Sequence, residues 1–235
     1  MRGIAGWLTE DQAMRLWHAS SRLAAGSTIV EIGSFRGRST VVLALGAPGG
    51  EIVAIDPHAG NDRGPQEIRG FEQQAQNDFD AFHANLTAAG VDAQVRHVRR
   101  FSGDAEAEVH GDIDLLFIDG AHRFCPARDD LLRWGQRVPA GGHVLVHDAF
   151  SSVGVTLALA AVYLASERYR YVGRSGSLVE YHVTSMTPVQ RGRNAVQQLV
   201  QLPWFARNVV IKMTLIARLP RLARALGHDG ETWPY

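Results

Sequence analysis

Two short apolar stretches decide how this chain folds: Thr28-Ile-Val-Glu-Ile-Gly33 and Glu51-Ile-Val-Ala-Ile-Asp56. Each has the length and the β-branched residues of one buried strand. The segment between them, from Gly37 to Leu45, has the pattern of a helix. A strand, a helix and a second strand in this order predict two parallel strands joined by a right-handed crossover.

The same alternation continues to residue 183. Further strands are predicted at 94–98, 112–119 and 143–147, further helices at 71–89, 127–137 and 155–166, and a closing hairpin at 169–173 and 178–183. We therefore predict an α/β, Rossmann-like, doubly wound, mostly parallel seven-stranded sheet with an antiparallel edge strand. A helix that begins with a capping box of Thr9 and Gln12 precedes the first strand.

Composition and charge bound the protein class. The 235 residues are 46% hydrophobic and 20% charged, which is typical of a folded globular chain. The formal net charge is zero, but residues 183–228 carry seven basic residues and no acid. We therefore divide the chain into a domain at 1–186, with its N-terminal helix as a lid, and a basic amphipathic helical extension at 187–235. Lys212 is the only lysine.

Cysteine usage and hydropathy suggest a compartment. The single cysteine, Cys125, leaves no internal disulfide and favours a reducing, cytoplasmic location. We expect its side chain to be buried filler. No secretory signal and no run of 18 uncharged apolar residues is recognisable, so we expect no spanning helix.

The loop after the first strand, Gly33-Ser-Phe-Arg-Gly37, is a candidate ligand site, because ligands of open parallel sheets bind at the carboxyl ends of the strands. Its G-x-x-x-G spacing matches neither the dinucleotide fingerprint nor the P-loop. Asp56 can accept hydrogen bonds from a ribose, Glu31 can hold an ammonium group, and free N–H groups at 33–37 suit a carboxylate. A tight turn with a solvated Asp56 is the alternative, but the combination favours S-adenosylmethionine.

Three motifs resemble those of one known family: Glu31-Ile-Gly-Ser-Phe-Arg-Gly-Arg-Ser-Thr40, Phe117-Ile-Asp-Gly-Ala-His122 and Pro139-Ala-Gly-Gly-His-Val-Leu-Val-His-Asp148. They are similar to the class I S-adenosylmethionine-dependent methyltransferases, in particular the small O-methyltransferase-like branch with D-G-x-H and H-D motifs, which includes metal-dependent sugar O-methyltransferases. The resemblance spans roughly residues 29–183. It implies a cofactor site lined by Glu31, Gly33, Ser34, Gly37, Ser39, Asp56 and Asp119, with Ser102 and Asp104 near the adenine.

Acids and histidines follow two further strands. Asp119 ends the fourth predicted strand, and His147 and Asp148 end the fifth. We expect all three to bind a divalent metal, for which Mg²⁺ is the first choice of carboxylates. Asp119 and His122 are the expected catalytic residues, with His122 as general base, a role that the resemblance supports. In the alternative, Asp119 and Asp148 cap helices and His122 bonds a backbone carbonyl.

These residues predict an O-methyltransferase that uses S-adenosylmethionine to methylate a hydroxyl of a sugar, glycoside or glycolipid. A small phenolic or polyhydroxy metabolite is the alternative acceptor. A non-catalytic cofactor-binding partner protein is an alternative of another class. Candidates for acceptor recognition are Trp7 and Trp17 near the N-terminus and His58 in the segment 57–70.

The stretch 189–226 interleaves basic and apolar residues. Such a stretch is typical of peripheral contact with a membrane or a lipid-like substrate. We favour instead a cap on the acidic body or a dimer interface, and we expect a homo-oligomer. Nucleic-acid binding is not expected, because no nucleic-acid module signature is present.

Overall fold

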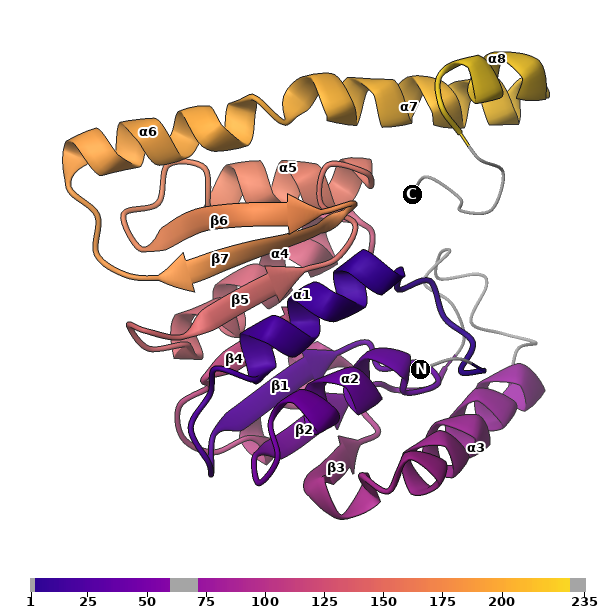
Figure 1. Cartoon of the computed structure of the whole chain (residues 1–235), viewed down its shortest axis with the longest axis vertical. Coiled ribbons are helices and arrows are strands. Elements are labelled where there is room, and N and C mark those ends of the chain that lie inside the picture. Colours follow the sequence, from indigo (N-terminus) through magenta and orange to yellow (C-terminus); the bar gives the residue numbers. More distant parts are fainter. Residues whose placement is uncertain (1–2, 60–71, 229–235) are drawn as a thin grey trace.

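The computed structural model describes residues 3–59 and 72–228. Its core is one seven-stranded sheet with the order β3-β2-β1-β4-β5-β7-β6 (Figure 1). The strands are β1 (Thr28–Ile32), β2 (Glu51–Ile55), β3 (Val95–Val98), β4 (Leu115–Ile118), β5 (His143–Val146), β6 (Tyr169–Ser175) and β7 (Leu178–Val183). Strands β1 to β5 pair in parallel, and β7 pairs antiparallel with both β5 and β6. The predicted fold class is confirmed.

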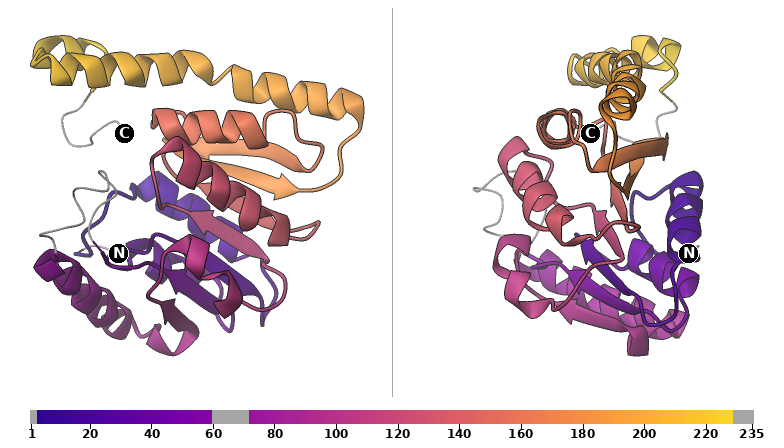
Figure 2. Two further views of the ribbon diagram at one scale, coloured as in Figure 1. Left: turned by 180° about the vertical axis from the view of Figure 1, so that it is seen from behind. Right: turned by 90° about the vertical axis from the view of Figure 1, so that its left-hand side faces the viewer.

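Helices cover both faces of the sheet (Figure 2). One face packs against α1 (Glu10–Ser20), α2 (Arg38–Gly46) and α3 (Glu72–Ala89), and the other against α4 (Phe124–Arg133) and α5 (Val153–Val162). Successive residues of β1 alternate between the two cores: Val30 lies with α4 and α5, whereas Ile29 lies with α1 and α2. Burial on both faces explains why the strands are apolar runs rather than alternating patterns.

The capping signal in the sequence predicted the start of α1 correctly. The capping box of Thr9 and Gln12 opens α1: the Thr9 amide donates to the Gln12 side chain at 2.8 Å, and the Gln12 amide donates back to the Thr9 hydroxyl at 3.4 Å. The helix predicted at 127–137 is shorter and earlier, because α4 ends at Arg133 and a 3₁₀ turn, Gly135–Arg137, follows.

The C-terminal segment forms three helices, α6 (Pro188–Leu199), α7 (Leu202–Ile216) and α8 (Pro220–Ala225). Helix α6 lies over the β6 edge of the sheet, and α7 and α8 continue beyond it (Figure 1). Each has a proline in its first turn, where the missing N–H costs nothing. The division at residue 186 falls between β7 and α6, and independent folding of the two parts stays a prediction. No helix in the described ranges has the length and apolar character needed to cross a membrane.

The end of β1 meets the end of β4 at a glycine. Gly33 has a φ of +86°, and its amide donates to the Ile55 carbonyl at 2.9 Å. A Cβ at this position would lie 2.1 Å from the backbone oxygen of Asp119. Only glycine therefore allows the loop after β1 to approach the loop after β4 this closely.

We predict that Gly33→Ala destabilises the fold by several kcal/mol, because both the backbone conformation and the Asp119 oxygen oppose a Cβ. Gly49→Ala is the matched control: its φ is +83°, but nothing lies within 4 Å of the added Cβ. It should cost only about 1–2 kcal/mol, the backbone penalty alone. Free energies of unfolding in urea measure both. Equal losses would show that the β1–β4 approach is not tight.

Candidate active site

Backbone strain gathers at the carboxyl ends of the parallel strands. In the described chain, five non-glycine residues have a φ near +50°, and four of them, Phe35, His58, Asp148 and Phe150, follow β1, β2 or β5. Such residues cost about 1–3 kcal/mol each and persist where the surroundings hold them. Their position matches the edge where ligands of open α/β sheets bind.

Glu31 is a fully buried carboxyl on β1. Burial raises its pKa to about 8, although hydrogen bonds from Ser39 and Thr40 oppose the shift. The Thr40 hydroxyl donates to Oε2 at 2.5 Å, whereas Oε1 has no hydrogen-bond partner. A buried acid with one unsatisfied oxygen is suited to a cation, because an incoming positive charge would stabilise its ionised form.

Asp56 holds the glycine loop from the end of β2. Its two oxygens accept hydrogen bonds from the amides of Phe35, at 2.8 Å, and His58, at 2.7 Å. His58 Nε2 lies 2.7 Å from the Phe35 carbonyl oxygen. The His58 ring is buried edge-on against Phe79 and Phe82. His58 is therefore a structural support of the loop, which corrects its expected place among acceptor contacts; residues 60–70 of the same candidate segment lie outside the described residues.

The amides of the glycine loop are less available than expected. Those of Gly33, Phe35 and Gly37 already donate to the Ile55 carbonyl, the Asp56 side chain and the Ser34 carbonyl. The Ser34 hydroxyl, in contrast, is buried without a hydrogen-bond partner. The Ser34 hydroxyl is thus a side-chain group that this loop can offer a ligand.

Ser102 and Asp104, expected near an adenine, differ in environment. Asp104 is exposed, and the Ser102 hydroxyl donates to Asp130 Oδ1 of α4 at 2.5 Å. Burial raises the pKa of Asp130 to about 6. Asp130 also lies beneath the loop after β4, where Oδ2 would be 3.7 Å from a Cβ on Gly120. Sequence reasoning missed Asp130, because a single acid within a helix carries no signal of burial.

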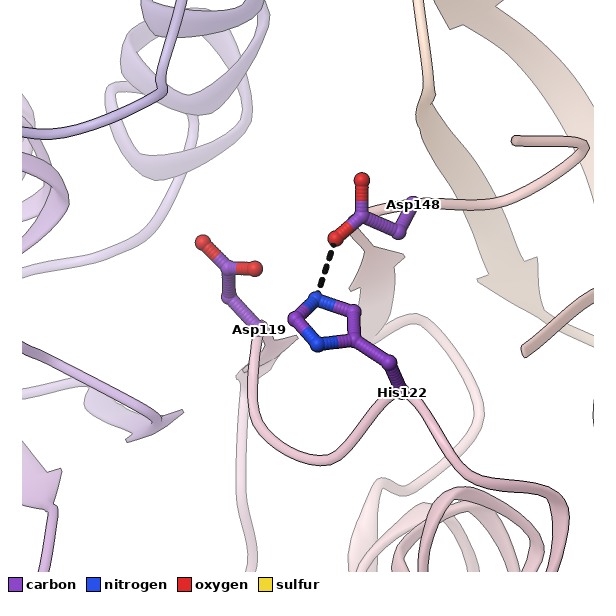
Figure 3. A group of neighbouring side chains, drawn as sticks. All are labelled: Asp119, His122 and Asp148. Atoms are coloured by element: carbon purple, nitrogen blue, oxygen red, sulfur yellow. Dashed lines mark hydrogen bonds and ion pairs between the residues drawn. The ribbon is translucent and has the colours of Figure 1, made fainter. Parts of the chain in front are cut away.

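Two acids and two histidines meet where β4 and β5 end. His122 Nε2 lies 2.6 Å from Asp148 Oδ2 (Figure 3). His147 Nδ1 lies 3.2 Å from Asp119 Oδ1 and 3.3 Å from Asp148 Oδ2. The side chains of Asp148 and His147 are buried, whereas those of Asp119 and His122 are 29% and 35% exposed. Asp119 and His122 are therefore accessible to a ligand, whereas Asp148 and His147 lie buried beneath them.

The buried pair carries opposite charges. Burial disfavours the charged form of His147, but Asp119 and Asp148 outweigh it and raise its pKa well above the ordinary value. Burial likewise opposes ionisation of Asp148, but His147 and His122 hold its pKa well below its usual range. The capping alternative is wrong, because Arg123 and Ser152 occupy the N-cap positions of α4 and α5.

The residues able to hold a metal differ from the expected set. Ligand atoms of Asp119, His122 and Asp148 lie within 4.8 Å of one another, so His122 takes the place predicted for His147. His147 faces both carboxylates with Nδ1, while Nε2 lies 3.3 Å from the Gln12 side-chain oxygen. A protonated imidazole has no lone pair for a metal. Gln12 was predicted only as a capping residue, and its reach to His147 was missed.

Other candidates lie at different distances from this edge. Trp7 packs on the glycine loop, with its ring centroid 5.2 Å from that of Phe35, and it is 53% exposed. Trp17 lies at the far end of α2, where its carbonyl oxygen would be 3.1 Å from a Cβ on Gly46. Trp7 therefore lies at the site as a candidate for acceptor contact, whereas Trp17 lies away from it. Cys125 is exposed, which corrects the expectation that it is buried.

Comparison with known proteins agrees with this geometry. The family model described as a methyltransferase domain matches residues 30–149, just over half of the chain. An uncharacterised protein, R132, of Acanthamoeba polyphaga mimivirus is 27% identical over 126 residues, which are 52% of this chain and 51% of R132. The alignment therefore spans about half the length of that relative.

Solved structures share the fold at low identity. The O-methyltransferase TomG from Streptomyces achromogenes, solved with S-adenosylmethionine, aligns with a TM-score of 0.56 and 18% identity over 79% of this chain and 84% of TomG. A putative rRNA methylase from Clostridium thermocellum aligns with a TM-score of 0.55 and 11% identity over 76% of this chain and 98% of the methylase. These likenesses establish the fold and leave the acceptor open. With the family model spanning the glycine loop, Asp119, His122 and Asp148, the chain belongs to the methyltransferase-domain family.

Proposed function

We propose that this protein transfers a methyl group from S-adenosylmethionine to a hydroxyl oxygen. The observation that carries the proposal is the His122–Asp148 pair, 2.6 Å apart, which lies with Asp119 beside the glycine loop of β1. Membership of the methyltransferase-domain family supports methyl transfer, and the fold shared with the O-methyltransferase TomG supports an oxygen acceptor.

The cofactor fits the groups at the ends of β1 and β2. The unsatisfied Oε1 of Glu31 would accept the ammonium group, and the buried Ser34 hydroxyl would donate to the carboxylate. Oδ2 of Asp56 accepts one hydrogen bond from the glycine loop and Oδ1 accepts one from the His58 amide, which leaves lone pairs for the ribose hydroxyls. When bound, the cofactor supplies an electrophilic methyl group on a sulfonium sulfur.

His122 is the proposed general base. Asp148 accepts a hydrogen bond from Nε2 and so favours the tautomer that carries its proton on Nε2 and its lone pair on Nδ1. His122 would take the hydroxyl proton while the acceptor oxygen attacks the methyl group, which the cofactor would supply with its sulfur as the leaving group. His147 and His122 hold the pKa of Asp148 well below its usual range, and Asp119 directs a second carboxylate at the same space.

A divalent metal at Asp119, His122 and Asp148 is the second candidate arrangement, supported by the spacing of their ligand atoms. A metal there would polarise the acceptor hydroxyl. His122 would then be a metal ligand rather than the base, so this arrangement competes with the hydrogen-bonded pair. The positive charge of His147 offsets one of the two carboxylates and weakens the attraction for a cation, which favours the base mechanism.

The acceptor we favour is a sugar, glycoside or glycolipid hydroxyl. Trp7, half exposed beside the glycine loop, offers an aromatic face on which a sugar ring can stack. A phenolic or polyhydroxy metabolite would use the same face and remains the second candidate acceptor.

Replacing His122 by Ala should lower turnover by about 10²–10⁴-fold, the usual contribution of a positioned base. Binding of S-adenosylhomocysteine, measured by calorimetry, should change little. His110→Ala is the matched control, because His110 is exposed and lies in the segment between β3 and β4. Turnover of His122→Ala equal to that of His110→Ala would remove His122 from the mechanism.

Chelation separates the two arrangements. If His122 acts as the base without a metal, dialysis against EDTA should leave the methylation rate unchanged. A rate that falls on chelation and returns with added Mg²⁺ or Mn²⁺ would establish the metal arrangement instead.

Glu31→Gln should weaken the pH dependence of stability in the cofactor-free protein. The pKa of Glu31 rises from 4.5 to about 8 on folding, so its protonated form stabilises the fold at low pH. That contribution is complete below pH 4.5 and is lost as the pH rises to 8, by about 5 kcal/mol in all. Urea unfolding of both proteins at several pH values measures the difference. The Gln variant should also bind S-adenosylhomocysteine about tenfold more weakly or worse. Parallel pH profiles for the two proteins would show that Glu31 is not neutral in the folded state.

A further inference from the structure

The helices α6 and α7 present apolar side chains to solvent. We define the outer strip as Val189, Val196, Leu202, Val210, Met213 and Ile216, whose exposed fractions range from 42% to 69%. At 100° per residue, those of α7 lie within one continuous face, together with Ala206. The outer strip therefore extends over two consecutive helices.

The opposite face of these helices packs on the body. It is polar in α6, where Asn194 and Gln198 are buried, and mixed in α7, where Asn208, Ile211 and Thr214 are buried. The buried Asn194 side chain accepts from the Tyr171 amide and donates to the Tyr169 carbonyl, both in β6. In α7, the buried Asn208 donates to the Phe150 carbonyl oxygen at 3.1 Å. These amides satisfy backbone groups of the sheet edge and of the turn after Asp148, which is why the polar face points inward. The usual orientation of an amphipathic helix is thus reversed in α6, whereas α7 carries apolar side chains on both faces. Within the described chain, the side chains of the outer strip stay exposed.

Basic residues accompany the outer strip. Residues 183–228 contain seven basic side chains and no acid. Between described residues, one ion pair links them to the body, Arg191 with Glu167 at 3.8 Å. Arg218, Arg221 and Arg224, at the outer end of α7 and in α8, are exposed. The intramolecular partner expected for the basic segment therefore accounts for little of its charge.

We propose that the outer strip and its arginines dock the protein on the surface of an anionic lipid bilayer. Such a surface matches both properties, because it accepts apolar side chains below the headgroups and attracts arginine at their level. A second copy of the chain matches only the apolar side chains. If two outer strips faced each other, two sets of basic side chains would meet with no acid in either segment. The proposal does not depend on methyl transfer.

Flotation with vesicles tests the docking on the full chain. The protein should float with phosphatidylcholine vesicles that contain roughly 30% phosphatidylserine, and not with pure phosphatidylcholine, because the basic residues need surface charge. The double variant Met213→Glu, Ile216→Glu should reduce the partition coefficient at least about tenfold, since each apolar side chain loses its burial. Replacing Arg218 and Arg221 by Gln should weaken it about fivefold for each charge.

The matched control is Leu45→Glu, Leu132→Glu, which makes the same change in charge at residues with exposures of 56% and 47% on α2 and α4. It should float like the unaltered protein. Equal loss in both double variants, or flotation of the unaltered protein that ignores lipid charge, would overturn the proposal. So would a dimer, detected by light scattering, that Met213→Glu, Ile216→Glu converts to monomer while the unaltered protein fails to float. If that variant does not fold, as judged by circular dichroism, the lipid-charge dependence of the unaltered protein decides.

Discussion

This site depends on the burial of ionisable side chains at the carboxyl edge of the sheet. Glu31, His147 and Asp148 are almost completely buried at the ends of β1 and β5. Asp148 has two imidazoles beside it and stays ionised, whereas Glu31 has only hydroxyl donors and is held neutral near pH 7. One edge thus contains a carboxylate that keeps its charge and a carboxyl group that gains charge when a cation arrives.

The sequence predicted what depends on local pattern. Apolar runs ending at Gly33 and Asp56 specified parallel strands and the edge where a site belongs, and the Thr9–Gln12 spacing specified the start of α1. It did not predict pairs joined across the fold, such as Gln12 with His147 or Ser102 with Asp130. Such pairs depend on the relative placement of helices and strands, which a pattern along the sequence does not specify.

His122, and not the predicted His147, lies with Asp119 and Asp148 as a possible metal ligand, and the cause is related. His147 and Asp148 follow the last residue of β5, and both side chains are buried, with His147 Nδ1 3.3 Å from Asp148 Oδ2. The φ of +56° at Asp148 turns its carboxylate toward His122, while His147 stays beneath with Gln12. Spacing alone identified the cluster but not which histidine is accessible. For α6 the same limit applied: the sequence indicated two faces, and hydrogen bonds to backbone groups of β6 decided which one turned inward.

The outer strip also has a consequence for handling the free protein. Positive and negative side chains cancel to a formal net charge of zero at pH 7, so copies in solution feel little long-range repulsion. When that repulsion is missing, exposed apolar area promotes association between molecules. Colloidal stability should therefore be poorest near neutrality and improve on either side of it, although the folded state itself is unchanged.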